Sequence, residues 1–280
     1  MFFMKKLIKR ANEMYTKRRY KIVDMIAVKG LFLPLMAVFL IGCSQKDTDA
    51  GRNTAYEKST LPTEQKIGFE NIKSLNEDAF AWLYIPGTDI NYPILQDSEG
   101  DDSFYKSHNE YKEPDENGAI HIEAANLNDM CDFNEVIYGS SPKDGTGFAQ
   151  LNNFLDKEYF DEHKYVHVYM EDNSLIYYII AAYIRDDTKL LAQYDFTYAS
   201  GCMEFINEIY RKGDDSKIIR DGCETGLEPE HFLITLTTDS TDEPGKQTVV
   251  IGCLMGDVAG KIDRDVDYGD EDDINIQAEW

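Results

Sequence analysis

The polar residues with the strongest chemical potential follow an apolar stretch near the C-terminal end of the chain. Residues 232–241 read FLITLTTDST, in which apolar and β-branched residues alternate before the run stops abruptly. This pattern predicts a core strand that presents Thr238, Asp239 and Ser240 at its own C-terminal end. Two hydroxyls and a carboxylate at one strand end could bind a polar ligand or support acyl chemistry.

A second stretch carries the same signature. Residues 134–148 read NEVIYGSSPKDGTGF, a short apolar strand that breaks at Gly139 into a loop rich in serine, proline and glycine. Ser140 and Ser141 follow the break directly. A serine hydroxyl becomes a useful nucleophile only when a base lies beside it, so these residues alone do not specify an enzyme.

The elements that must position these residues are mostly strands, because apolar and β-branched residues recur in short runs separated by turn residues. We expect eight strands: Ala81–Ile85, Ile90–Leu95, Ala119–Glu123, Glu135–Tyr138, Tyr165–Met170, Leu175–Ile184, Phe232–Thr237 and Thr248–Met255. Eight strands are enough to close a barrel and so remove its exposed edges. The predicted fold is therefore mainly β, a closed eight-stranded β-barrel.

Helices are expected in three places. Residues 65–75 space their apolar side chains as an N-terminal helix would, and residues 148–155 and 201–212 predict one or two helices in the connections between strands. In the last segment Phe205, Ile206 and Ile209 form one apolar face. Such a face is typical of a helix that packs on a core.

Composition limits the function. The 280 residues contain 52 acidic and 28 basic side chains, a formal charge of −24, so the chain repels nucleic acid and we expect no nucleic-acid partner. The cysteines show no close-pair spacing, so we expect no metal and no cofactor. The sequence leaves open whether Cys202 and Cys223 form a disulfide. Cys253 lies inside an apolar strand and is expected to be buried and inert.

The five histidines are expected to be solvated surface residues, any one of which could instead be a relocated base. They are His108, His121, His163, His167 and His231. His121 alternates with two isoleucines, so its side chain is expected on the opposite face of its strand.

The first 42 residues hold nine lysines and arginines against two acids, then a short apolar run, which predicts an export signal. The following LIGC resembles the lipobox of bacterial lipoproteins, which implies that Cys43 is lipidated after cleavage; an uncleaved membrane anchor is the alternative. Residues 43–64 are polar and predict a flexible tether. The chain would then be extracytoplasmic, lipid-anchored to the outer face of the cytoplasmic membrane.

Several segments together resemble the class B sortases, the cysteine transpeptidases that attach proteins to Gram-positive cell walls. The resemblance covers residues 65–258 and leaves 259–280 as an acidic C-terminal tail. The segments that carry it, in family order, are WLYIPGTDINYPIL, GAIHIE, NEVIYGSSPKDGTGF and FLITLTTDST. Several motifs in register are more specific than any one of them.

The catalytic positions implied by the resemblance are changed. Ser140 stands where the family has histidine, Asp239 where it has the cysteine nucleophile, and Gln247 where it has arginine, or Lys246 if the register slips by one. A soft thiolate, an imidazole and a guanidinium are what this transpeptidation needs, so the resemblance implies a degenerate site with no intact catalytic residue. The candidate groove residues are Thr238, Ser240 and Ser141.

Three functions remain open at this stage. The first is a degenerate sortase-like surface lipoprotein that binds a peptide, such as a sorting-signal-like segment, or scaffolds another envelope protein. The second is a cell-wall sorting transpeptidase or peptidase that acts through Ser140 and Asp239, because the family geometry places these positions close together. The third is a purely structural lipoprotein without a groove ligand.

Overall fold

The computed structural model describes residues 70–211, 217–223 and 225–269, which lie in one compact unit of the chain. The predicted export signal (1–42), the lipidation site Cys43 and the tether (43–64) lie outside the described residues, as do residues 270–280 of the predicted tail. Those predictions stay predictions.

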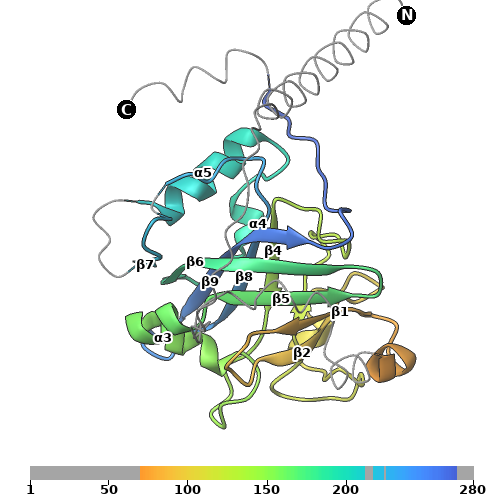
Figure 1. Cartoon of the computed structure of the whole chain (residues 1–280). Helices are drawn as coiled ribbons and strands as arrows, with labels where there is room; N and C mark the ends of the chain where they lie inside the picture. Colours follow the sequence, from red (N-terminus) through yellow and green to blue (C-terminus); the bar gives the residue numbers. More distant parts are fainter. Residues whose placement is uncertain (1–69, 212–216, 224, 270–280) are drawn as a thin grey trace, which may run out of the picture. The chain divides into compact units, whose positions relative to one another are not determined.

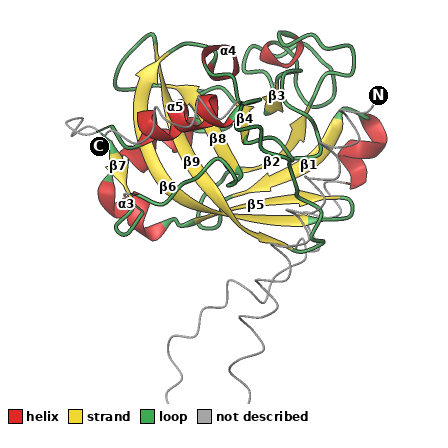
Figure 2. Cartoon of the chain, turned by 90° about the horizontal axis from the view of Figure 1, so that it is seen from above, coloured by secondary structure: helices red, strands yellow, loops and turns green. Residues whose placement is uncertain are grey.

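Eight strands close into a barrel, as predicted (Figures 1 and 2). The strands are β1 (Ala79–Tyr84), β2 (Asn91–Leu95), β3 (His121–Ile122), β4 (Asn134–Tyr138), β5 (Tyr165–Met170), β6 (Ser174–Asp186), β7 (Ile218–Ile219), β8 (Leu233–Asp239) and β9 (Lys246–Asp257). Their order is β5-β1-β2-β3-β4-β8-β9-β6-β7, and an additional β5–β6 pairing closes the ring. β7 is a short ninth strand outside the ring, paired with β6.

The barrel interior is filled by alternate residues of its strands. Leu83, Ile94, Ile137, Ile234 and Leu236 are all fully buried members of this core. The period-two alternation of apolar residues along each strand explains this, because successive side chains point to opposite faces of a sheet. The hydrophobic pattern that predicted the strands is thus the pattern that fills the barrel.

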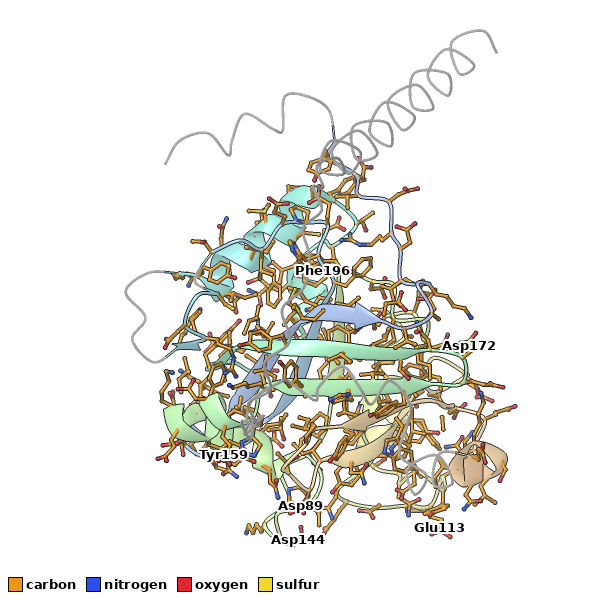
Figure 3. The ribbon with its side chains drawn as sticks, in the orientation of Figure 1. Asp89, Glu113, Asp144, Tyr159, Asp172 and Phe196 are labelled. Atoms are coloured by element: carbon orange, nitrogen blue, oxygen red, sulfur yellow. The ribbon has the colours of Figure 1, made fainter. Side chains whose placement is uncertain are left out.

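A helical layer covers one outer face of the barrel. α5 (Ala199–Ile209) buries Phe205 and Ile206 in a second cluster with Leu233 of β8, and Phe196, labelled in Figure 3, lies 5.6 Å from Phe205 between ring centroids. The short helix α4 (Leu190–Gln193) precedes it. The predicted apolar face of residues 201–212 is therefore core.

The remaining helical segments are short. Residues 70–75 are helical, η2 spans Phe104–Lys106, and the segment predicted as a helix at 148–155 is the 3-10 helix η3 (Ala149–Leu155). The α-helix α3 (Lys157–Glu162) follows, started by the Asp156 side chain, which accepts a hydrogen bond from the Tyr159 amide. The capping aspartate explains why helix resumes only after residue 156.

Acidic side chains lie on the periphery of the described region. Asp89, Glu113, Asp144 and Asp172 are exposed and sit on loops at the outer edges in Figure 3. No helix within the described ranges has the length and hydropathy needed to cross a bilayer.

Candidate functional site

Strand register brings the chemically interesting ends together. β4 and β8 are parallel and pair Tyr138 with Thr237, so both strands end at the same edge of the barrel. β8 and β9 are antiparallel and pair Asp239 with Gln247. β3 pairs with β4 and sets His121 opposite Tyr138. Four strands therefore converge on one edge.

A pocket of about 380 Å³ opens at this edge. Its lining includes all three residues that the resemblance assigned to the family's catalytic positions, Ser140, Asp239 and Gln247. The other lining residues are Tyr105, Lys106, Glu116, Asn117, Ala119, His121, Glu123, Tyr138, Gly139, Asp187, Thr188, Lys189, Thr237 and Thr238.

Of the three predicted groove residues, the structure brings only Thr238 into the pocket lining. Ser141 accepts a hydrogen bond from the Asn152 side chain, and the Ser240 hydroxyl accepts one from the Glu243 amide, at 3.2 Å in both cases. Both serines therefore organise adjacent loops, a role that their position after a strand end does not reveal.

Ser140 is half-buried, and its hydroxyl donates to the backbone carbonyl of Asn117 at 2.5 Å. The preceding Gly139 is tightly enclosed, because a Cβ built there would lie 2.4 Å from Ile120 and 2.7 Å from Phe148. The glycine thus lets the chain turn against the core, and the turn directs Ser140 toward residue 117. No hydrogen bond joins Ser140 to Asp239 in the described part of the chain.

Asp239 is exposed at the end of β8, and its carboxylate makes no hydrogen bond or ion pair with the described residues. Its backbone is fixed by Asn152 of η3, whose amide nitrogen donates to the Asp239 carbonyl at 3.1 Å. The Asn152 side-chain oxygen accepts from the Thr241 amide at 3.2 Å and the Thr248 hydroxyl at 2.7 Å. One asparagine therefore ties η3, the end of β8 and the start of β9 together.

Gln247 is buried, with 7% of its surface exposed, and its side chain is fully engaged. Its amide nitrogen donates to the carbonyls of Asp186 at 3.1 Å and Thr188 at 3.0 Å, and its oxygen accepts from the Thr237 hydroxyl. Since both amide hydrogens are used, this side chain is a clamp on the loop after β6. Lys246, the alternative for the family arginine, lines a neighbouring cavity instead.

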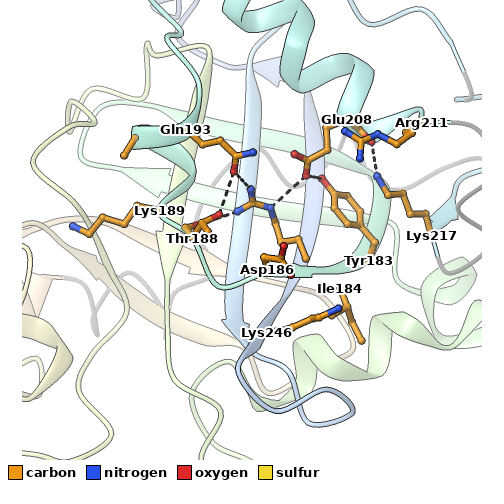
Figure 4. A pocket seen from close by; sticks show the side chains of 12 residues that line it. Tyr183, Ile184, Asp186, Thr188, Lys189, Gln193, Glu208, Arg211, Lys217 and Lys246 are labelled. Carbon is orange, nitrogen blue, oxygen red and sulfur yellow. Dashed lines mark hydrogen bonds and ion pairs between the residues drawn. The ribbon is translucent and has the colours of Figure 1, made fainter.

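That neighbouring cavity, of about 580 Å³, contains a buried guanidinium (Figure 4). Arg185 of β6 pairs in register with Gln247, so it lies one strand away from the family position. Its Nε contacts Glu208 at 3.3 Å, and its terminal nitrogens donate to the Thr188 carbonyl at 3.1 Å and to Gln193 at 2.5 Å. This arginine does not line the 380 Å³ pocket and holds α4, α5 and the 186–189 loop together.

Glu208 remains charged in this network. Burial raises the pKa of its carboxyl, but hydrogen bonds from Tyr194 and Tyr183 and the charge of Arg185 outweigh that effect and leave the pKa below its ordinary value. The charged carboxylate pairs with Arg185, which in turn donates to the carbonyl of Thr188, a residue that lines both cavities.

His121 is the residue that the sequence reading placed wrongly. It was expected to be a solvated histidine, but only 5% of its surface is exposed and it lines the pocket. Two aromatic rings cover the face of the strand that points away from the barrel interior. The His121 ring stacks on the Tyr138 ring with centroids 5.7 Å apart, and its centroid lies 6.5 Å from that of the Tyr105 ring. His163 and His167 are buried as well, against the same expectation.

An ion pair borders His121. The carboxylate of Glu123 is 3% exposed and lies 2.9 Å from Lys189, which also contacts Asp102 at 3.2 Å. The hydrogen bond that the Lys189 ammonium donates to the Glu123 carboxylate raises the pKa of Lys189. These contacts join the segment after β3 to the loop before α4 and form one side of the pocket.

None of the described cysteines, which are Cys131, Cys202, Cys223 and Cys253, lines the pocket, and Cys131, Cys202 and Cys253 are free thiols. Cys253 is 8% exposed, as expected for a residue that packs as a hydrophobe, and burial raises its pKa to about 11. A thiol with this pKa is protonated at neutral pH, so it is not a displaced nucleophile. Within the described ranges, no group of three or more His, Cys, Asp or Glu could hold a metal ion.

Known proteins resemble this chain in sequence and in fold. No family model matches the sequence. The chain is 40% identical to Sortase B of Listeria monocytogenes over 93 residues, which are 33% of this chain and only 37% of that protein. It is 23% identical to Sortase B of Staphylococcus aureus over 187 residues, which are 67% of this chain and 74% of that protein.

Solved structures give the same result. A cysteine-to-serine mutant form of Clostridium perfringens sortase B is 28% identical, covers 70% of this chain and 91% of its own, and superimposes with a TM-score of 0.60. Sortase B from Listeria monocytogenes is 26% identical, covers 66% of this chain and 99% of its own, and has a TM-score of 0.55. In sequence and in fold, the chain is therefore similar to the class B sortases.

Proposed function

We propose that this chain is an exported, lipid-anchored, class B sortase-like protein that has lost transpeptidase chemistry and binds a peptide where the family's catalytic centre lies. The observation that supports the proposal is the shared pocket: Ser140, Asp239 and Gln247 line one opening at the barrel edge. The described lining contains no cysteine and no arginine, and its histidine, His121, is buried on β3 and is not at the position that the resemblance assigns to the family's histidine.

The contacts of the three positions argue against acyl transfer. Ser140 donates its hydroxyl hydrogen to a backbone carbonyl, which cannot act as a general base. Attack on an amide by the Asp239 carboxylate would form a tetrahedral intermediate that expels the carboxylate more readily than the amine, which regenerates the amide. Gln247 uses both amide hydrogens on the loop after β6, so neither is available to an oxyanion.

Binding is favoured by the shape and chemistry of the same pocket. It is a cleft of the size range typical of ligand sites, and polar side chains converge on it from four strands and from several of the segments that connect strands. The Staphylococcus aureus protein, which is 21% identical in its substrate complex with a TM-score of 0.58, shares the fold that presents this edge. An extended segment such as a sorting-signal-like peptide is the partner that suits an opening between strand ends.

The anchor part of the proposal is supported by the sequence. The lipobox-like LIGC ends at Cys43, and two acyl chains on one cysteine suffice for stable membrane attachment, whereas one gives only marginal binding. Mass spectrometry of the mature chain expressed in a Gram-positive host tests it. A diacylated N-terminal Cys43, lost in Cys43→Ala, supports the anchor, and an uncleaved chain that begins at its initiating methionine rejects it.

The binding part is tested by incubating the full-length chain, in detergent, with class B sorting peptides, and by following cleavage and saturable binding separately. Binding without cleavage is expected. Cleavage that Asp239→Ala abolishes would favour a noncanonical peptidase or transpeptidase acting through Ser140 and Asp239. Neither binding nor cleavage would favour a purely structural lipoprotein.

A gain-of-function variant sharpens this test. We expect Ser140→His, Asp239→Cys and Gln247→Arg combined to restore measurable peptide cleavage, because the three positions already share one pocket. The matched control keeps aspartate at residue 239 beside the other two replacements and must stay inactive. A folded triple variant that binds peptide but does not cleave it would show that the groove geometry has drifted from that of the family.

A further inference from the structure

One lysine side chain connects two walls of the pocket. The ammonium of Lys189 lies 2.9 Å from the carboxylate of Glu123 and 3.2 Å from that of Asp102. Glu123 follows β3 and Lys189 follows β6, and the sheet order places β4, β8 and β9 between those two strands. Both Lys189 and Glu123 line the pocket. The ion pair therefore joins segments on opposite sides of the three strands whose ends form the pocket.

The backbone that precedes Lys189 is fixed. The Gln247 side chain donates hydrogen bonds to the carbonyls of Asp186 at 3.1 Å and Thr188 at 3.0 Å. In Figure 4 the Lys189 side chain points away from Glu208, which lies across the neighbouring cavity. Because the preceding residues are anchored to β9, the long Lys189 side chain is the part of this wall that can move.

The carboxylates that receive the ammonium are held in place. Glu123 is 3% exposed, and the second oxygen of Asp102 accepts a hydrogen bond from the Ala124 amide at 2.8 Å. The Lys189 side chain, in contrast, is 52% exposed. A half-exposed ammonium can exchange its contacts for water, and dissolved salt screens them. The ion pair thus has a fixed, buried side and a releasable, exposed side.

We propose that Lys189 acts as a gate residue of the pocket. While its ammonium contacts Glu123 and Asp102, the side chain closes the gap between the two walls, and when the ammonium moves into water, the gap opens to an entering peptide. The inference rests on the proposed peptide binding and adds how access to that site is controlled. A peptide that enters must wait for the lysine to leave or displace it, so the gate limits the rate of association.

Labelling of His121 with diethyl pyrocarbonate measures the opening without a peptide. This reagent acylates a neutral imidazole, and His121 lines the pocket with 5% of its surface exposed. Its Nδ1 lies 2.9 Å from the Ala119 carbonyl, which only accepts, so Nδ1 carries the hydrogen and Nε2 is the atom that reacts. His167 is 8% exposed and lies outside the pocket lining, so it reports on general loosening of the fold. The full-length chain is labelled in detergent, and the rate at each histidine is read by peptide mass spectrometry.

Removal of the ammonium should open the gate. Lys189→Met keeps an unbranched side chain without the charge, and we expect His121 to be labelled about fivefold faster or more, with His167 unchanged, as the loss of a strong surface ion pair predicts. Lys189→Arg keeps a cation and should be labelled like the unaltered chain. Lys157→Met is the matched control, because it removes a half-exposed ammonium that pairs with an aspartate on α3, outside the pocket lining. If Lys189→Met fails to fold, the double variant with Glu123→Gln takes its place, because it leaves no unpaired buried carboxylate.

Salt gives a second measurement of the same gate. Raising sodium chloride from about 0.05 M to about 0.5 M shortens the range of electrostatic interactions, so labelling of His121 should speed up in the unaltered chain and stay constant in Lys189→Met. Equal labelling of the two chains at low salt would overturn the inference. A rise at His167 as large as that at His121 would also overturn it, because the whole fold would then have loosened.

Association of class B sorting peptides connects the gate to function. Stopped-flow fluorescence of a labelled peptide should show that Lys189→Met associates faster, by about the same factor as His121 is labelled. Peptides that associate with both chains at the same rate would overturn the inference and leave the proposed peptide binding intact. Faster labelling of His121 in a chain that binds no peptide would support the gate and reject the peptide function.

Discussion

Replacing Gln247 by leucine removes the clamp that holds the pocket wall. The variant loses the two hydrogen bonds to the Asp186 and Thr188 carbonyls and the one from the Thr237 hydroxyl. At about 1 kcal/mol net for each hydrogen bond, the free energy of unfolding should fall by roughly 2–4 kcal/mol. A domain of this size loses about 2–4 °C of Tm per kcal/mol, so the expected drop is roughly 4–16 °C.

Urea denaturation of the full-length chain, followed by circular dichroism, measures this change. Asp239→Asn is the matched control, because the paired position on β8 is exposed and its carboxylate makes no contact with the described residues, so its effect should stay within about 0.5 kcal/mol. The double variant with Thr237→Val should show a coupling of about 0.5–3 kcal/mol, as neighbours that share a hydrogen bond do. If Gln247→Leu changes stability by less than its control, the amide is not a clamp and could serve a ligand instead.

Three further perturbations test other parts of the structure. Arg185→Met leaves Glu208 buried without its partner and should lower the free energy of unfolding by about 3–5 kcal/mol, measured in urea; a near-neutral result would mean that water reaches the pair. Gly139→Ala forces a methyl group against Ile120 and should destabilise by about 1–3 kcal/mol, read from the Tm; no loss would mean that the strand end shifts freely. Burial, reinforced by the charge of a neighbouring aspartate, raises the pKa of Glu135. This group therefore stabilises the fold only at low pH and loses that contribution as pH rises toward its folded-state pKa. Glu135→Gln should raise Tm at pH 7 with a gain that shrinks toward pH 4.5, and a pH-independent gain would contradict the assignment.

The barrel was predictable from the sequence because its strands carry their hydrophobic alternation locally. Residues 165–170 match β5 at both ends, and the predicted strands around them overlap the observed ones. Asp239 and Gln247 are register partners on β8 and β9, and their assignment to the family's cysteine and arginine positions stays a prediction. β7, only two residues long, carries no pattern of its own and was not predicted.

The environment of His121 was not predictable in the same way. Alternation with two isoleucines correctly indicated the opposite face of the strand, but that face is covered by groups distant in sequence. Tyr105 and the Lys189–Glu123 ion pair cover it, and Lys189 lies 66 positions beyond Glu123 in the sequence. The residue pattern of one strand shows which side chains lie on each of its two faces. It does not show which loop covers a face.

The role of Gln247 was hidden for a related reason. Its position next to a strand start suggested a replaced catalytic residue, whereas its hydrogen bonds reach backbone carbonyls about 60 residues earlier in the chain. Backbone carbonyls leave no signature in a sequence, because every residue has one. Only coordinates distinguish an exposed polar substitute from a structural tie.

The parallel pairing of β4 with β8 has a consequence for how the chain matures. Glu135 meets Ile234 across this ladder, so roughly 100 residues are synthesised after β4 before its neighbour exists. Until then one edge of β4 has open backbone hydrogen-bonding groups, which can recruit a strand from another molecule. Such late closure makes folding slow and cooperative, since ring completion requires the entropy of a long loop to be lost first. A truncation before β8 would therefore yield an aggregating chain and not a smaller stable domain.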